Sequence, residues 1–149
     1  MFLKLIGGIL IILACGFSGI IFSNRSNNRP RDLKRFRSLM QMLETEIIYS
    51  ATPLPEALYS LSNKSEARFS SFFAYISDCL RGRQFFSFRD AWVSGVNTVL
   101  LKETSLSNTD AEIISNFGNV LGCSDRNDQK KHFELLYIQL KHNEAVAEE

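Results

Sequence analysis

The sequence predicts an all-α protein, with an N-terminal transmembrane helix followed by a six-helix bundle made of two three-helix halves. Residues 5–22 are 18 consecutive residues without a charge, a run long enough to span a bilayer as a helix. Beyond this run, apolar residues recur at every third or fourth position, which is the spacing of an amphipathic helix. Strand signals are scarce, because the sequence contains no Asn-Gly or Asp-Gly hairpin turn.

The composition is that of one globular domain with a short appendage. The chain has 149 residues, of which 45% are hydrophobic and 22% charged, and its net charge is +1. This balance excludes a disordered tail and a protein that binds partners through overall positive charge. The sequence has three cysteines, an odd number that does not make a disulfide framework. It has two histidines, which limits any metal or acid–base site.

The first expected domain is a transmembrane anchor over residues 1–23. The apolar side chains expected to hold it in the membrane are Leu5, Ile9, Ile12, Phe17, Ile20 and Phe22. A cleaved signal peptide is disfavoured, because no A-x-A-like site follows the apolar run. The alternative is an exported helical lipoprotein or envelope adaptor anchored through Cys15, since the preceding Ile-Leu-Ala resembles a lipobox. The run stays apolar to Phe22, whereas a lipoprotein tether is polar after its cysteine.

Two more domains are expected after the anchor. They are a basic juxtamembrane linker over residues 24–29 and a cytoplasmic helical bundle over 30–149. The juxtamembrane basic residues are Arg25, Arg29, Arg31, Lys34, Arg35 and Arg37, which give residues 23–40 a net charge of +5. Because positive flanks stay in the cytoplasm, the N-terminus is expected outside the membrane and the bundle inside. Such a collar can also hold the anionic headgroups of the lipid bilayer. Residues 41–149 have a net charge of −5, and no nucleic-acid partner is expected.

The first two helices of the bundle are expected over 30–49 and 53–62. Pro30 suits a helix start. One apolar stripe then follows, made of Leu33, Phe36, Met40, Leu43 and Ile47. For the second helix, Thr52 is the expected N-cap and Pro53 the first helical residue.

The third and fourth helices are expected to begin at Ser65 and Ser87, since serine is a favoured N-cap. The third ends near Gly82 and carries an inward face of Phe69, Phe72, Phe73, Ile76 and Leu80. The fourth contains Trp92 among its apolar positions, and a core role for this side chain is favoured over a ligand stack.

The last two helices are expected to begin at Ser107 or Asn108 and at Ser124 with Asp125. Acidic residues in the first turn of the fifth helix, Asp110 and Glu112, suit the helix dipole. Its apolar stripe ends at Gly122 and includes Ile113, Ile114, Phe117, Val120 and Leu121. The sixth helix runs toward Ala147, and its buried face is expected to be Phe133, Leu136, Tyr137 and Leu140.

No catalytic motif emerges, so the chain is not expected to be an enzyme or to bind a metal, a cofactor or a small-molecule substrate. His132 and His142 are ten residues apart, too far for an i, i+4 metal pair on one helix. Cys79 and Cys123 are interpreted as small buried thiols. Gly118 is interpreted as a site of close helix packing.

A series of short strings, in order along nearly all of residues 1–149, resembles the stage III sporulation protein AB family of endospore-forming bacteria. The strings include Leu3-Lys4-Leu5-Ile6-Gly7, Arg29-Pro30-Arg31, Leu43-Glu44-Thr45-Glu46-Ile47, Thr52-Pro53-Leu54, Asp90-Ala91-Trp92, Phe117-Gly118, Ser124-Asp125 and Gln129-Lys130-Lys131-His132. Family members are similar in fold to the cytoplasmic domain of type II secretion and type IV pilus inner-membrane platform proteins.

The resemblance implies a non-enzymatic platform subunit of the channel complex that joins the mother cell to the forespore. It implies a location in the mother-cell membrane and, as partners, the other subunits of that complex. Chief among these is its cytoplasmic secretion-type ATPase, the AA protein. The family also carries a second hydrophobic segment after the helical domain, whereas this sequence runs to Glu149 without one.

The residues proposed to contact the ATPase are charged groups on the bundle. They are Glu44, Glu46 and Glu56, together with a basic turn formed by Arg81 and Arg83. Charged helix faces are more often simply solvated, so this assignment is a hypothesis.

Overall fold

The computed structural model describes residues 1, 6–8, 11, 28–82, 87–121, 123 and 125–149. These residues form helices, turns and connections without a strand, which confirms the predicted all-α class. In this part of the chain no helix is both long and apolar enough to cross a membrane. All six predicted anchor residues, and also Cys15, Arg25 and Arg83, lie outside the described residues.

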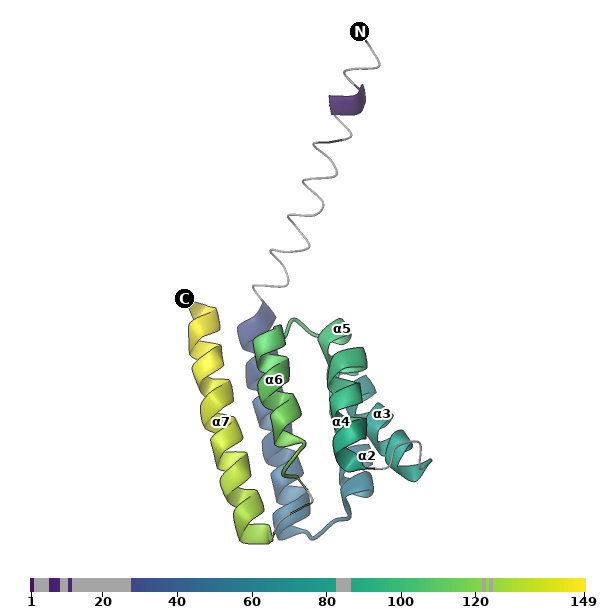
Figure 1. Ribbon diagram of the computed structural model, residues 1–149, viewed down its shortest axis with the longest axis vertical. Helices are drawn as coiled ribbons and strands as arrows, with labels where there is room; N and C mark the ends of the chain where they lie inside the picture. The colour runs from purple at the N-terminus through teal and green to yellow at the C-terminus, as the bar shows by residue number, and fades with distance from the viewer. Residues whose placement is uncertain (2–5, 9–10, 12–27, 83–86, 122, 124) are drawn as a thin grey trace.

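The helices follow one another in the order that the apolar spacing predicts (Figure 1). The chain is helical over 28–44 and continues without a break through one π-helical turn, η1 (Thr45–Tyr49). The remaining elements are α2 (Leu54–Lys64), α3 (Ala67–Arg81), α4 (Phe88–Gly95), η2 (Val96–Leu100), α5 (Leu101–Glu103), α6 (Asn108–Phe117) and α7 (Arg126–Glu148). Since α4, η2 and α5 are also continuous, the described residues 28–149 form six helical rods.

Three of the predicted helix starts are correct. The Ser87 side chain accepts a hydrogen bond from the Asp90 backbone and caps α4. Ser107 caps α6 in the same way, and Asp110 completes a capping box by accepting from the Ser107 backbone. Asp125 caps α7.

The predicted starts of the second and third helices are each wrong by one residue, and the first helix is already formed at Asn28, before the predicted start at Pro30. Pro53 is the N-cap of α2, with an extended backbone, and the Thr52 hydroxyl donates to Glu46 at 2.9 Å instead of capping. Glu66 stands at the N-cap of α3, because the Ser65 hydroxyl donates back to the Leu61 carbonyl. Each hydroxyl donates to another nearby oxygen instead of capping a helix, and sequence spacing alone does not reveal that choice.

The helices do not divide into consecutive halves as predicted. Helix 28–44 lies beside α6 and α7, and polar side chains connect all three, while α2, α3 and α4 group on the other side (Figure 1). The same helix packs on α3 through Phe36, whose ring lies 6.2 to 6.4 Å from those of Phe69, Phe72 and Phe73. Helix 28–44 is therefore common to both groups, and the buried apolar residues form one core.

The bundle has two ends, which differ in what they carry. The proximal end is where the described helix begins at residue 28, where the connection 104–107 passes and where α7 ends (Figure 1). The distal end carries the connection 50–53 and the start of α7. Because consecutive helices alternate in direction, residues distant in sequence meet at each end.

Most of the predicted core residues are buried, while Ile47, Leu80, Ile113, Val120 and Tyr137 are only partly buried and pack against the core. Trp92 is fully buried, and its indole Nε1 donates to the Ile114 carbonyl at 2.7 Å. Cys79 is buried as predicted, but Cys123 is exposed because the chain has left α6 and turns toward α7 there. Gly118 lies directly against the Trp92 ring, as predicted from close packing, although it caps α6 rather than lying inside it.

Candidate functional site

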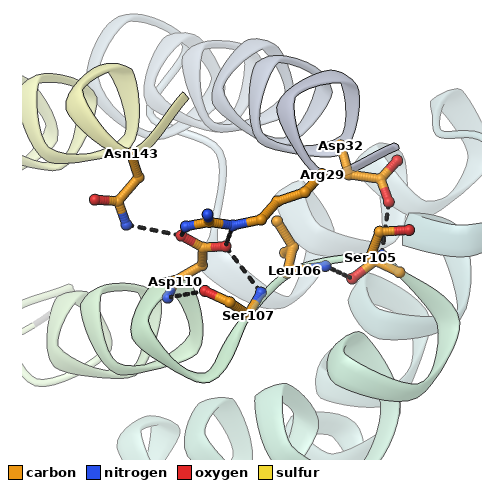
Figure 2. Close-up of polar contacts among 8 residues, drawn as sticks. Arg29, Asp32, Ser105, Leu106, Ser107, Asp110 and Asn143 are labelled. Carbon is orange, nitrogen blue, oxygen red and sulfur yellow. Dashed lines mark hydrogen bonds and ion pairs between the residues drawn. The ribbon is translucent and has the colours of Figure 1, made fainter. Parts of the chain in front are cut away.

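A buried ion pair at the proximal end joins the first described turn of helix 28–44 to α6. Arg29 Nε lies 2.8 Å from Asp110 Oδ2, and Arg29 Nη2 lies 2.9 Å from Asp110 Oδ1 (Figure 2). This two-pronged arrangement matches the planar guanidinium to the carboxylate, the strongest geometry such a pair adopts. The Asp110 side chain is fully buried, while the Arg29 side chain is 22% exposed. The described helix is thus locked to the bundle from its second residue, Arg29.

Other groups complete the hydrogen bonding of Asp110. Its Oδ1 accepts from the Asn143 amide on α7 at 2.7 Å, and its Oδ2 accepts from the Ser107 backbone at 2.8 Å (Figure 2). Burial opposes a charge on Asp110, but the hydrogen bonds from Arg29, Ser107 and Asn143 outweigh it and lower the pKa of the carboxyl. The same contact with Asp110 raises the pKa of Arg29. Both groups are therefore charged at neutral pH.

A second carboxylate, Asp32, holds the neighbouring connection between α5 and α6. Asp32 is only 3% exposed and accepts from the Ser105 backbone at 2.7 Å. Arg68 at the start of α3 lies 3.3 Å from Asp32 on the other side. Figure 2 shows Asp32 and Arg29 on the same helix, with Asp32 pointing toward Ser105 in the connection and Arg29 toward Asp110 in α6.

Together these contacts make a polar junction, defined here as Arg29, Asp32, Ser105, Ser107, Asp110 and Asn143. Each of its carboxylates is satisfied by hydrogen bonds, so neither is left as a free acid or base. Within the described ranges, no three His, Cys, Asp or Glu side chains gather as a metal ion would require. The junction fixes the position of residue 29 relative to α6 and α7.

Three of the five collar residues that the structure describes are paired with carboxylates of the bundle. Arg29 is held by Asp110, Arg35 lies 3.0 Å from Glu66, and Arg37 lies 3.1 Å from Glu144. Arg31 and Lys34 are exposed and make no ion pair with any residue that the structure describes. The positive charge available to a lipid surface is therefore smaller than the net charge of residues 23–40, because carboxylates distant in sequence neutralise part of it.

The predicted ATPase-contacting residues lie away from the proximal end. Glu44 and Glu46 are 15 and 17 residues beyond Arg29 on one continuous helix, about 25 Å along its axis. Both already have partners. Tyr137 donates to Glu44 at 2.6 Å, and Glu46 accepts from Lys64 at 3.4 Å in addition to Thr52.

Glu56 and Arg81 are the more accessible members of that set. Glu56 is exposed in the first turn of α2. Arg81 is exposed at the end of α3, where its guanidinium stands 4.6 Å from the ring centre of Tyr59. The antiparallel packing of α2 and α3, marked by the 2.9 Å hydrogen bond from Ser77 to the Pro55 carbonyl, brings these two ends together.

The sequence did not identify Asp32, Asp110 and Asn143 as members of a site. One signal was present for Asp110, since a serine three residues before an acidic residue is a capping-box pattern. That pattern predicts a helix start, but it does not predict the contact of Asp110 with Arg29, which is 81 residues away. Asn143 lies in an ordinary polar stretch of α7 and carries no pattern of its own.

Three comparisons with known proteins agree on the family of this chain. A family profile described as "Stage III sporulation protein AB" matches residues 4–149. The stage III sporulation protein AB of Bacillus subtilis (strain 168) is 33% identical over 148 residues, which cover 99% of this chain and 85% of that protein. A solved structure of a stage III sporulation protein AB matches with a TM-score of 0.75 and 33% identity, over 83% of this chain and 95% of that one. The chain therefore belongs to the stage III sporulation protein AB family, whose members are sporulation proteins.

Proposed function

We propose that this protein is a non-enzymatic platform subunit of the sporulation channel complex, anchored by residues 1–23, with its bundle in the cytoplasm. The observation that carries the proposal is the polar junction at the proximal end. It holds Arg29, the last residue of the predicted basic linker, against α6 and α7 through Asp110. A platform that transmits position or force needs its bundle to hold the end of the linker firmly, and the junction does this at Arg29.

The distal end is the surface proposed for the ATPase. Glu56 and Arg81 are exposed there, about one helix length from the junction. A bundle held by its proximal end presents this distal end to the cytoplasm. The positive charge of the linker supports this orientation, because positive flanks stay on the cytoplasmic side.

Membrane topology tests the first half of the proposal. Protease is added to intact spheroplasts that carry the full chain with a C-terminal tag. Protection of the tag until the membrane is opened supports a cytoplasmic bundle. Digestion from outside refutes it, because no cytoplasmic ATPase then reaches the bundle.

Charge exchange at the distal end tests the second half. The double variant Glu56→Lys with Arg81→Glu leaves the net charge unchanged and is expected to abolish capture of the AA protein by the tagged full chain. The matched control is Lys102→Glu with Glu103→Lys, since both residues are exposed on α5 near the proximal end. Equal capture by wild type and by the distal variant removes Glu56 and Arg81 from the ATPase contact.

A further inference from the structure

A groove runs between helix 28–44 and α7, on the side of the bundle rather than at either end. Its volume is about 350 Å³. One wall comes from Lys34, Arg37, Ser38 and Gln41, and the other from Ile138 and Lys141. The lining extends from Lys34 to Gln41, about 10 Å along one helix, and from Tyr137 to Lys141 on the other, so the groove suits an elongated occupant.

The charge of the groove is opposite to that of the domain. Arg37 is neutralised by Glu144, but Lys34 and Lys141 stand exposed on opposite walls without an ion pair to any described residue. Residues 41–149 are net negative by five charges, so a positive groove on this background is a local feature. Gln41 adds an amide that can donate to carboxylate oxygens, whereas the Ser38 hydroxyl already donates to the Lys34 carbonyl.

An apolar contact lies beside the lysines. Ile138 is 67% exposed in the wall of the groove, and Leu135, one turn earlier on α7, is 53% exposed. Leu135 lines a separate hollow between α6 and α7, so Ile138 supplies the aliphatic contact of this groove. An occupant that satisfies both features carries acidic groups and an aliphatic side chain.

We infer that this groove binds an acidic segment of a partner protein, with carboxylates at Lys34 and Lys141 and an aliphatic side chain at Ile138. A protein segment fits better than a lipid headgroup, because Lys34 to Gln41 lie about 8 to 18 Å beyond Arg29 along the helix axis. The groove thus opens along the side of the bundle, away from the linker. This surface is additional to the distal end proposed for the ATPase.

Peptide binding to the full chain in detergent micelles tests the inference. The probe is a fluorescein-labelled peptide of Glu-Glu-Leu repeats, followed by anisotropy at low and high salt. Binding is expected to weaken with salt, because exposed charges are screened. The double variant Lys34→Glu with Lys141→Glu is expected to weaken binding about tenfold, and Ile138→Ser about threefold.

A control variant with the same change in net charge separates the groove from general attraction. Lys102→Glu with Lys130→Glu alters two exposed lysines outside the groove and is expected to change binding less than about twofold. Equal weakening by both double variants, or no binding of the peptide to wild type, overturns the inference. So does binding to phosphatidylglycerol nanodiscs, but not to the peptide, that requires Lys34 and Lys141.

Discussion

Arg29 and Asp110 are 81 residues apart in sequence, yet their side chains are joined by two hydrogen bonds of 2.8 and 2.9 Å. Asp110 has no exposed surface, and Asn143 contacts it from α7. The contact ties helix 28–44, α6 and α7 together at one point. Since Arg29 is the last residue of the predicted basic linker, the same point connects the bundle to the N-terminal segment.

Removing Arg29 is expected to destabilise the bundle strongly. Arg29→Met leaves a buried carboxylate without its cation, which costs about 3 to 5 kcal/mol of unfolding free energy. Thermal or urea unfolding of the full chain in detergent, followed by circular dichroism, measures this loss. The matched control is Arg35→Met, because its pair with Glu66 is about half exposed and contributes less than about 1 kcal/mol.

The double variant Arg29→Met with Asp110→Asn checks that the loss arises from the pair. The neutral amide no longer needs a cation, so the double variant is expected to be more stable than Arg29→Met alone. Additive losses from the two single variants would show that Arg29 and Asp110 are not coupled.

Acid is expected to weaken the bundle through Asp110. Its pKa is lowered from the ordinary value of 3.8, so the folded state favours the charged form. The resulting stability is present in full above that ordinary value and is lost as the pH falls through the lower, folded pKa. The difference in unfolding free energy between wild type and Asp110→Asn should therefore be large at pH 6 and shrink below about pH 4. A difference independent of pH would contradict a charged Asp110.

The helices themselves were predictable, because their apolar spacing is local information. Leu33, Phe36 and Met40 are all fully buried, as a repeat of three and four residues requires. Serine caps at Ser87 and Ser107 were also predictable, since each is followed three residues later by an aspartate.

Contacts between distant segments were not predictable in the same way. The basic residues Arg35 and Arg37 looked like free positive charge, because Glu66 and Glu144 come 31 and 107 residues later. The expected consecutive halves failed for a related reason. Sequence order gives which helices are adjacent along the chain, whereas the contacts of helix 28–44 with α3, α6 and α7 decide which are adjacent in space.

Gly118→Ala is expected to disturb the core at Trp92. A Cβ at this position would lie 2.3 Å from Trp92 Cδ1 and 2.7 Å from Cγ, closer than real contacts allow. The backbone φ of Gly118 is −61°, so alanine brings no backbone strain and the effect is steric. Overpacking of this kind costs about 1 to 3 kcal/mol.

Because Trp92 is the one tryptophan in the sequence, its fluorescence reports the change directly. A shifted emission maximum and a lower unfolding temperature are expected for Gly118→Ala. Gly95→Ala is the control, since its Cβ would meet Ile76, Phe72 and Tyr75 side chains at 3.1 to 3.3 Å, a contact that small shifts relieve. An unchanged Gly118→Ala variant would mean that the ring moves aside without cost.

Replacement of Cys15 separates a retained anchor from a lipoprotein. In a retained anchor the thiol has no processing role, so wild type and Cys15→Ala are both expected to remain at full length in the membrane fraction. In a lipoprotein, wild type would be cleaved before Cys15 and carry a lipid, and Cys15→Ala would accumulate as a precursor. Intact-mass measurement distinguishes the two, since cleavage removes residues 1–14. A shortened, lipid-modified wild-type chain would place the bundle outside the cytoplasm and exclude contact with a cytoplasmic ATPase.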